Sequence, residues 1–188
     1  MSSTVSTPTT GATVIYEIDA AHSSAQFKIR HMMISNVRGS FAKVSGTVTA
    51  DPSHPERSTI AAEIDVNSVN TNDEKRDAHL RSQDFFHVEN HPVMTFRSNK
   101  VLHKGKHEFE VTGDLTIRGI TKPVTLSVET TEEVKDPWGN QRIGATATGR
   151  VDRRQFDLNF NVPLDNGGFL VGNDVDITLE VELIRKSS

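Results

Sequence analysis

The sequence predicts an all-β protein, an antiparallel barrel of about eight strands with one short helix. Apolar and polar residues alternate along most of the chain, which is the pattern of half-buried strands. Several alternating runs are much longer than the usual strand of about five or six residues. Short turn-forming stretches separate the runs. Many strands joined in this way form a sandwich or a barrel, and their length favours an elongated barrel.

The composition limits the class of protein. A chain of 188 residues suits one domain, which we expect over residues 14–186 after a polar, disordered tail at residues 1–13. The net charge of −4 gives no sign of a basic surface, so we expect no nucleic-acid partner. Without cysteine, the chain has no disulfide, no thiol nucleophile and no thiolate ligand for a metal.

The N-terminal sequence and the hydropathy bear on location. No apolar run reaches the roughly 18–20 residues that a membrane helix needs. The start lacks the basic residues and the apolar stretch of a secretory signal. We therefore expect a cytoplasmic protein, or a periplasmic one if a signal has been removed.

The predicted strands place apolar side chains at every second position. In chain order, the inward positions are Ala25, Phe27, Ile29, His31; Ile60, Ala62, Ile64, Val66; Met94, Phe96, Leu102; Phe109, Val111, Leu115, Ile117; Val124, Leu126, Val128; Ile143, Ala145, Ala147, Val151; and Val175, Ile177, Leu179, Val181, Leu183. Turns are expected at residues 104–106, 118–123, 136–141 and 165–168. Several inward positions carry alanine, which leaves room for a cavity inside the barrel.

One stretch has helix-forming residues in place of alternation. We predict a helix over residues 73–81, with Thr71 and Glu74 at the spacing of a capping box. Asp77 and Arg81 have the i,i+4 spacing of a helical ion pair. The stretch continues into Phe85 and Phe86, which we expect to plug one end of the core.

Closure of a barrel requires that its first and last strands pair. The outward face of residues 24–31 carries Lys28 and Arg30, whereas the outward face of residues 174–184 is acidic. Opposite charges on neighbouring strands stabilise their pairing. We therefore predict that these two segments lie side by side.

The histidine-rich stretch "HLRSQDFFHVENHPVMTF" raises the question of a metal site. His87 and His91 have ligand-like spacing, but Pro92 disfavours a helix there, so we predict a loop with structural or exposed histidines and no metal. The motifs G-x-S-x-G, Walker A and G-x-G-x-x-G are absent. An enzyme that uses Asp77, His79 and Asp84 stays open as an alternative.

A set of motifs resembles the YceI-like family of polyisoprenoid-binding proteins. These are "HSSAQFKIRH", "VRGSF", "RDAHLRSQDFF", "HPVMTFRS", "VTGDLTIRGITKPV" and "VGNDVDITLEVEL", in family order. The resemblance covers roughly residues 16–184. It implies a lipocalin-like barrel with a long apolar bore, no catalysis, and frequent pairing as a homodimer. The chain departs from the family where Asp157 or Leu158 replaces a glycine.

The resemblance also implies the ligand, a polyprenyl phosphate, an isoprenoid quinone or a similar amphiphile, with no other cofactor. Such a tail needs a dry tube lined by apolar side chains. The expected lining is Phe27, Ile29, Ile60, Ile64, Phe85, Phe86, Phe96, Phe109, Val111, Leu115, Leu126, Phe156, Phe160, Leu179 and Val181. Met32 and Met33, with Ile34, would form a flexible lip.

The polar part of such a lipid needs donors near the mouth of the bore. Arg38, Arg76 and Arg81 are the head-group candidates. The chain would carry or sequester the lipid and contact a membrane transiently. A surface-interaction module with a solid core is a further alternative.

Overall fold

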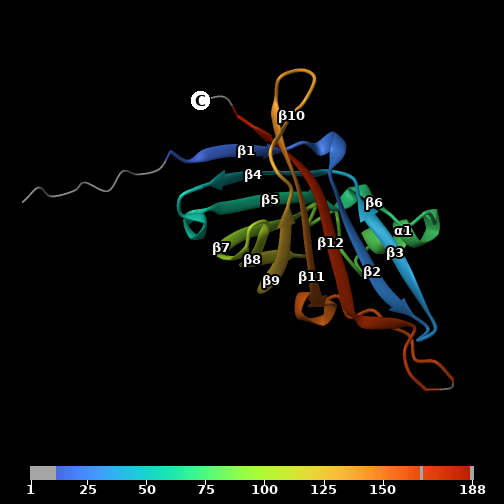
Figure 1. The fold of residues 1–188 in the computed structure, drawn as a ribbon. Helices are drawn as coiled ribbons and strands as arrows, with labels where there is room; N and C mark the ends of the chain where they lie inside the picture. The colour runs from blue at the N-terminus through green and yellow to red at the C-terminus, as the bar shows by residue number, and fades with distance from the viewer. Residues whose placement is uncertain (1–11, 166, 187–188) are drawn as a thin grey trace, which may run out of the picture.

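The last strand, β12 (Val171–Arg185), closes the sheet of this protein into a barrel (Figure 1). A computed structural model describes residues 12–165 and 167–186. Strand β12 pairs with β11 (Gln141–Asp152) on one side and with β1 (Val14–Ile18) and β2 (Ser24–His31) on the other. The predicted antiparallel barrel of eight strands with one short helix is confirmed. The predicted disordered tail falls largely on residues 1–11, outside the described part.

The remaining elements complete the ring and its ends. The other strands are β3 (Ser35–Phe41), β4 (Val44–Ala50), β5 (Thr59–Asp65), β6 (Val69–Asn70), β7 (Val93–Gly105), β8 (Glu108–Ile117), β9 (Ile120–Thr130) and β10 (Val134–Lys135). The helices are α1 (Glu74–Arg81) and the 3-10 turns η1 (Ala20–His22), η2 (Pro55–Arg57), η3 (Val66–Ser68) and η4 (Arg153–Phe156).

Three of the barrel strands are each interrupted near the same level. Each interruption divides one barrel strand into two consecutive segments. Turn η1 separates β1 from β2, residues 42–43 separate β3 from β4, and η3 separates β5 from β6. On one side of the break β1 pairs with β4 and β4 with β5, and on the other side β2 pairs with β3 and β3 with β6. Counted as three bent strands, they join β7, β8, β9, β11 and β12 in one ring of eight.

The predicted contact between residues 24–31 and 174–184 is confirmed. Asp176 pairs with Lys28 across the β12–β2 ladder, and their side chains form an ion pair of 3.0 Å. Arg150 binds the same carboxylate at 2.6 Å from β11 and is the main reason that the pKa of Asp176 lies below its usual value. The expectation that residues 24–31 form the first strand was wrong, because β1 precedes them and also pairs with β12.

The assignment of Leu102 to the interior was wrong because β7 contains a bulge. Ser98 pairs with Gly113 and Lys100 with Thr112, so Asn99 is an extra residue in the ladder. The extra residue reverses the alternation from that point on. Val101 is therefore the inward residue, opposite Val111, and only 5% of it is exposed.

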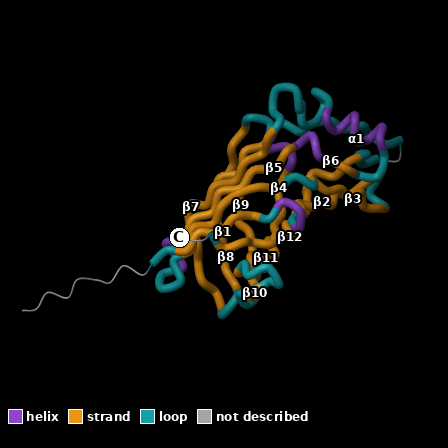
Figure 2. Tube along the Cα trace, turned by 90° about the horizontal axis from the view of Figure 1, so that it is seen from above, coloured by secondary structure: helices purple, strands orange, loops and turns teal. Residues whose placement is uncertain are grey.

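The predicted helix is present as α1, which lies at one end of the barrel (Figure 2), but its N-terminal cap differs from the prediction. Its N-cap is Asp73, whose carboxylate accepts a hydrogen bond from the Arg76 amide, so the predicted capping box is wrong. Asp77 does not pair with Arg81. It is buried and accepts hydrogen bonds from the amide and hydroxyl of Thr71 at 2.8 and 2.6 Å.

The loop after α1 covers part of this end of the barrel. Phe85 and Phe86 pack against the buried core, and Phe86 contacts Phe41 edge-on with ring centroids 5.7 Å apart. The core cluster at this end includes the fully buried Phe156 and Val66. The two phenylalanines therefore pack into one end of the core, as predicted, and they also border the cavity inside the barrel.

We predict that Asp77→Ala destabilises the protein by about 2 kcal/mol, because two Thr71 donors lose their buried acceptor. Urea unfolding monitored by circular dichroism measures the free energy of unfolding. Glu74→Ala, at an exposed position of the same helix, is the control and should cost less than about 0.5 kcal/mol. Equal effects of both substitutions would show that the Thr71 contact does not anchor the helix.

Candidate functional site

A cavity of about 690 Å³ extends through the barrel. Along β12, every second residue from Val175 to Leu183 borders it, and so does Val171. At ~3.3 Å per residue, this stretch is on the order of 40 Å long. Tyr16 and Ile143 line the cavity near one end, and Phe160 lines it near the other, where α1 lies. A site of this size can enclose a ligand of several hundred daltons.

The lining is almost entirely apolar, and the barrel is hollow at its centre. Phe27, Ile29 and Leu179 point inward but are only partly buried, because no side chain fills the space in front of them. Small residues at inward positions maintain the space. They are Ala25, Ala62, Ala145 and Ala147, all of which border the cavity. The alternative of a solid core is therefore wrong.

The structure brings the predicted lining together around this cavity. All fifteen residues of the expected lining border it, whereas Met32 and Met33, predicted to form the lip, do not. These two form the turn between β2 and β3, with φ of 50° and 62°, and their side chains are 42% and 58% exposed. The turn lies beyond the cavity, next to the residues that line its end. The flexible lip stays a prediction.

The three arginines proposed for the head group lie in different places. Only Arg76 borders the cavity, and its guanidinium donates to the hydroxyl and carbonyl of Thr71 at 2.8 and 2.9 Å. Arg81 donates to the carbonyl groups of Asn67 and Val69. Arg38 lies on the outer face, opposite Lys28. The structure thus does not gather the three into one site.

Arg153 borders the cavity as well, and sequence reasoning missed it. Its side chain is only 3% exposed, and it donates to the carbonyl oxygens of Leu158, Phe160 (2.9 Å) and Gly172 (2.7 Å). It forms no ion pair within the described residues, and burial lowers its pKa. The sequence shows two adjacent arginines, and only the η4 turn decides that Arg153 faces inward while Arg154 pairs with Asp152 outside.

Asp157 is one of the two positions at which the family resemblance implies a glycine. Asp157 caps η4 in the left-handed conformation, with φ 57° and ψ 27°. Glycine adopts this conformation without steric cost, and aspartate tolerates it better than most other residues. Leu158 follows with 6% exposure. Phe156, directly before Asp157, lines the cavity.

His79 and Asp84 form a polar pair at the same end of the cavity. The Nε2 atom of His79 lies 2.8 Å from a carboxylate oxygen of Asp84, and the imidazole contacts Phe85 and Phe160 edge-on. Asp77 is not part of this group, since it binds Thr71. Ser82 donates its hydroxyl hydrogen to the His79 carbonyl and does not bond to the ring. Ser82 is therefore not positioned as a nucleophile for this pair.

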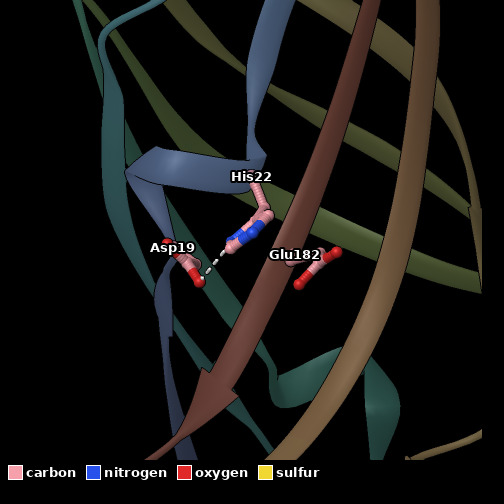
Figure 3. A group of neighbouring side chains, drawn as sticks. All are labelled: Asp19, His22 and Glu182. Carbon is pink, nitrogen blue, oxygen red and sulfur yellow. Dashed lines mark hydrogen bonds and ion pairs between the residues drawn. The ribbon is translucent and has the colours of Figure 1, made fainter.

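The histidines with ligand-like spacing lie in a loop, as predicted. The rings of His87 and His91 are 5.8 Å apart between centroids. Among residues 12–165 and 167–186, one group could bring three ligand atoms together, namely Asp19, His22 and Glu182 (Figure 3). The guanidinium of Arg142 already binds Asp19 at 2.7 Å and Glu182 at 2.9 Å.

The Arg142 guanidinium makes this group an ion-pair cluster rather than a good cation site. Hydrogen bonds from Arg142 and then from His22 lower the pKa of Asp19 to about 2. Arg142 also binds Asp136 at 2.8 Å and is the main cause of the low pKa of that carboxyl. The cluster ties the hairpin of β10 and β11 to η1, where the first bent strand changes direction.

No helix in the described ranges is both long enough and apolar enough to cross a bilayer.

Comparison with known proteins identifies the fold and the family. The YceI-like domain pattern matches residues 16–183. Protein YceI of Salmonella newport is 36% identical over 182 residues, which cover 95% of this chain and 92% of that protein.

Two solved structures share the fold. The barrel of BcnA from Burkholderia cenocepacia superimposes with a TM-score of 0.76, covering 88% of this chain and 98% of BcnA at 24% identity. A polyisoprenoid binding domain from Saccharophagus degradans, implicated in plant cell wall breakdown, gives a TM-score of 0.64 over 91% of this chain and 98% of that domain, at 16% identity.

We predict that Arg142→Gln lowers the melting temperature near neutral pH. The melting temperature of the variant should also fall less than that of the wild type when the pH is lowered. The pKa of Asp19 is lower in the folded state than its ordinary value of 3.8. Its stabilisation is therefore complete above about pH 4 and is lost as the pH falls through about 2. Melting curves at several pH values between 2 and 7 measure the effect. Arg97→Gln, at an exposed position of β7 without an ion pair in the described residues, should leave this acid dependence unchanged. A wild-type acid profile in Arg142→Gln would contradict the prediction.

Proposed function

This chain belongs to the YceI-like family, and we propose that it binds a long-chain isoprenoid lipid in its cavity and carries or sequesters it without a covalent step. The continuous apolar cavity is the observation on which the proposal depends. Its lining contains aliphatic and aromatic side chains from all eight barrel strands. Such a lining suits a ligand that is long, apolar and without hydrogen-bonding groups over most of its length.

The energetics favour a long tail. Each CH₂-sized unit removed from water contributes about 0.8 kcal/mol, so tens of carbons bind tightly without specific contacts, even after the tail loses conformational freedom. The similarity to the polyisoprenoid binding domain from Saccharophagus degradans supports an isoprenoid tail.

The polar groups near α1 support a position of the lipid head group at that end of the cavity. Arg153, Arg76 and His79 border the cavity at this end, whereas its middle is apolar. A buried guanidinium without a carboxylate partner favours an oxygen-rich head group nearby. A polyprenyl phosphate and an isoprenoid quinone both meet this requirement, and the phosphate interacts more strongly with the cation.

The His79–Asp84 pair supports a second candidate function, an enzyme that acts on the lipid head. A histidine oriented by a carboxylate is a common general base. Turnover of a polyprenyl phosphate that disappears in His79→Ala, with lipid binding intact, would establish this candidate instead of passive carriage.

We predict that mass spectrometry of an organic extract of the purified protein detects a polyprenyl lipid. Ala147→Phe should reduce the lipid recovered per mole of protein at least tenfold, because the added ring projects into the cavity between Val128 and Leu179. Thr146→Phe is the matched control, since Thr146 is exposed on the outer face of the same strand. It should retain wild-type recovery.

Three results would count against the proposal. One is the absence of any extractable lipid from folded protein. Another is equal recovery from Ala147→Phe and Thr146→Phe. The third is an extract that contains only straight-chain fatty acids, which would leave a lipid-binding barrel but exclude the isoprenoid ligand.

A second prediction separates the two head groups. Arg153→Met keeps an unbranched side chain, shorter than that of arginine, and removes the charge, so the share of phosphate-headed lipid in the extract should fall at least tenfold relative to uncharged lipid. Arg153→Lys retains a cation and should preserve much of that share. An unchanged lipid profile in folded Arg153→Met would show that Arg153 has only a structural role.

A further inference from the structure

Two turns that are far apart in the sequence form one exposed apolar tip. We define the apolar tip as Met32, Met33 and Ile34 of the β2–β3 turn together with Val162 and Phe169 of the segment before β12. Ile34 is 77% exposed and Phe169 56% exposed. Figure 1 shows both turns projecting from the same corner of the molecule.

Backbone hydrogen bonds join the two halves of the apolar tip. The Met32 amide donates to the Leu170 carbonyl at 2.8 Å, and the Leu170 amide donates to the Val162 carbonyl at 2.9 Å. A methyl group added to Gly168 would lie 3.6 Å from Met33 Cγ. The five side chains therefore belong to one surface rather than to independent loops.

The apolar tip is continuous with the end of the cavity. His31 directly precedes Met32, and Leu170 directly follows Phe169, and both of these neighbours line the cavity. An apolar ligand that enters or leaves at this end thus passes beside the apolar tip. Few soluble surfaces expose this many large apolar side chains in one place without a partner.

The β2–β3 turn has an unfavourable backbone for its residues. Both Met32 and Met33 have positive φ, a conformation that asparagine and glycine adopt far more readily. The two methionines therefore do not stabilise the backbone conformation of the turn. Their long, adaptable side chains are instead available to an external apolar phase.

Cationic side chains lie behind the apolar tip. Arg30 is exposed and donates to the Met33 carbonyl at 3.0 Å. Arg38 is exposed on the neighbouring strand and forms no ion pair or hydrogen bond within residues 12–165 and 167–186. An apolar end followed by unpaired cations is complementary to an anionic lipid surface.

We propose that the apolar tip docks onto an anionic lipid bilayer, where the isoprenoid ligand passes between membrane and cavity. This inference rests on the proposed function. A second copy of the chain fits less well as the occupant, because a symmetric contact through the apolar tip would bring the Arg30 and Arg38 side chains of both copies together. The apolar tip projects from the molecule, and this shape favours its insertion into a lipid bilayer over packing against a flat protein surface.

The single tryptophan of the chain makes the docking end measurable. Trp138 is 81% exposed in the turn after β10, at the opposite end of the barrel (Figure 1). Phe169→Trp in a Trp138→Phe background moves the fluorophore to the apolar tip. With vesicles that contain phosphatidylcholine and 30 mol% phosphatidylglycerol, its emission should shift to the blue and be quenched by brominated lipid. The native Trp138 should respond to neither.

Variants test the surface without relying on the reporter. Ile34→Asp should weaken sedimentation with these vesicles at least tenfold, whereas Val134→Asp, at an exposed apolar residue of β10, should leave it unchanged. The double variant Met32→Asn/Met33→Gly should melt at a higher temperature and still bind vesicles several-fold more weakly. Arg38→Gln should lose the preference for anionic vesicles, and Lys100→Gln should keep it.

The outcomes are distinct from those that test the cavity. No vesicle association of folded protein would overturn docking even if the extract contains lipid, and vesicle association with an empty cavity would overturn the proposed function instead. A response of Trp138 alone, or equal losses in Ile34→Asp and Val134→Asp, would place any docking elsewhere and refute the inference. A dimer in sedimentation equilibrium that Ile34→Asp dissociates, without vesicle binding, would identify a second copy as the occupant.

Discussion

Continuous pairing along β12 is the constraint on which the rest of the structure depends. This strand is long enough to pair with β11 along one edge and with β1 and then β2 along the other. The ring therefore has no unpaired edge between these strands, and hydrogen-bonded backbone forms the wall. A wall of this kind does not need a filled interior. The apolar core is concentrated near α1, around Phe156 and Val66, and the middle of the barrel stays hollow.

Alternation was sufficient to predict most of this architecture. Because side chains point to opposite faces along a strand, the pattern determined the lining correctly wherever the ladder is regular. The pattern predicted the wrong inward residue in β7, because the hydrophobic pattern before Val101 does not reveal the bulge at Asn99. The pairing of β12 with β2 could be predicted because complementary charges lie at Lys28 and Asp176.

The polar parts of the candidate site were harder to predict. A charged residue usually faces water, so no feature of the sequence indicated that Arg153 lies inside the barrel. Its position depends on η4 and on four carbonyl groups brought together by tertiary structure. Asp77 was assigned to an ion pair on helical spacing, whereas a contact with Thr71 across the start of the helix determines its role. Membership of the YceI-like family, by contrast, followed from short motifs spread over the whole chain.

The most direct test of the hollow barrel is a crystal structure of protein purified without detergent or added lipid. The account predicts a continuous tube of electron density inside the barrel, from the neighbourhood of Tyr16 and Ile143 to that of Phe160, in contact with Phe27 and Leu179. A cavity filled with ordered water, or side chains that meet in the middle and leave no space, would contradict it.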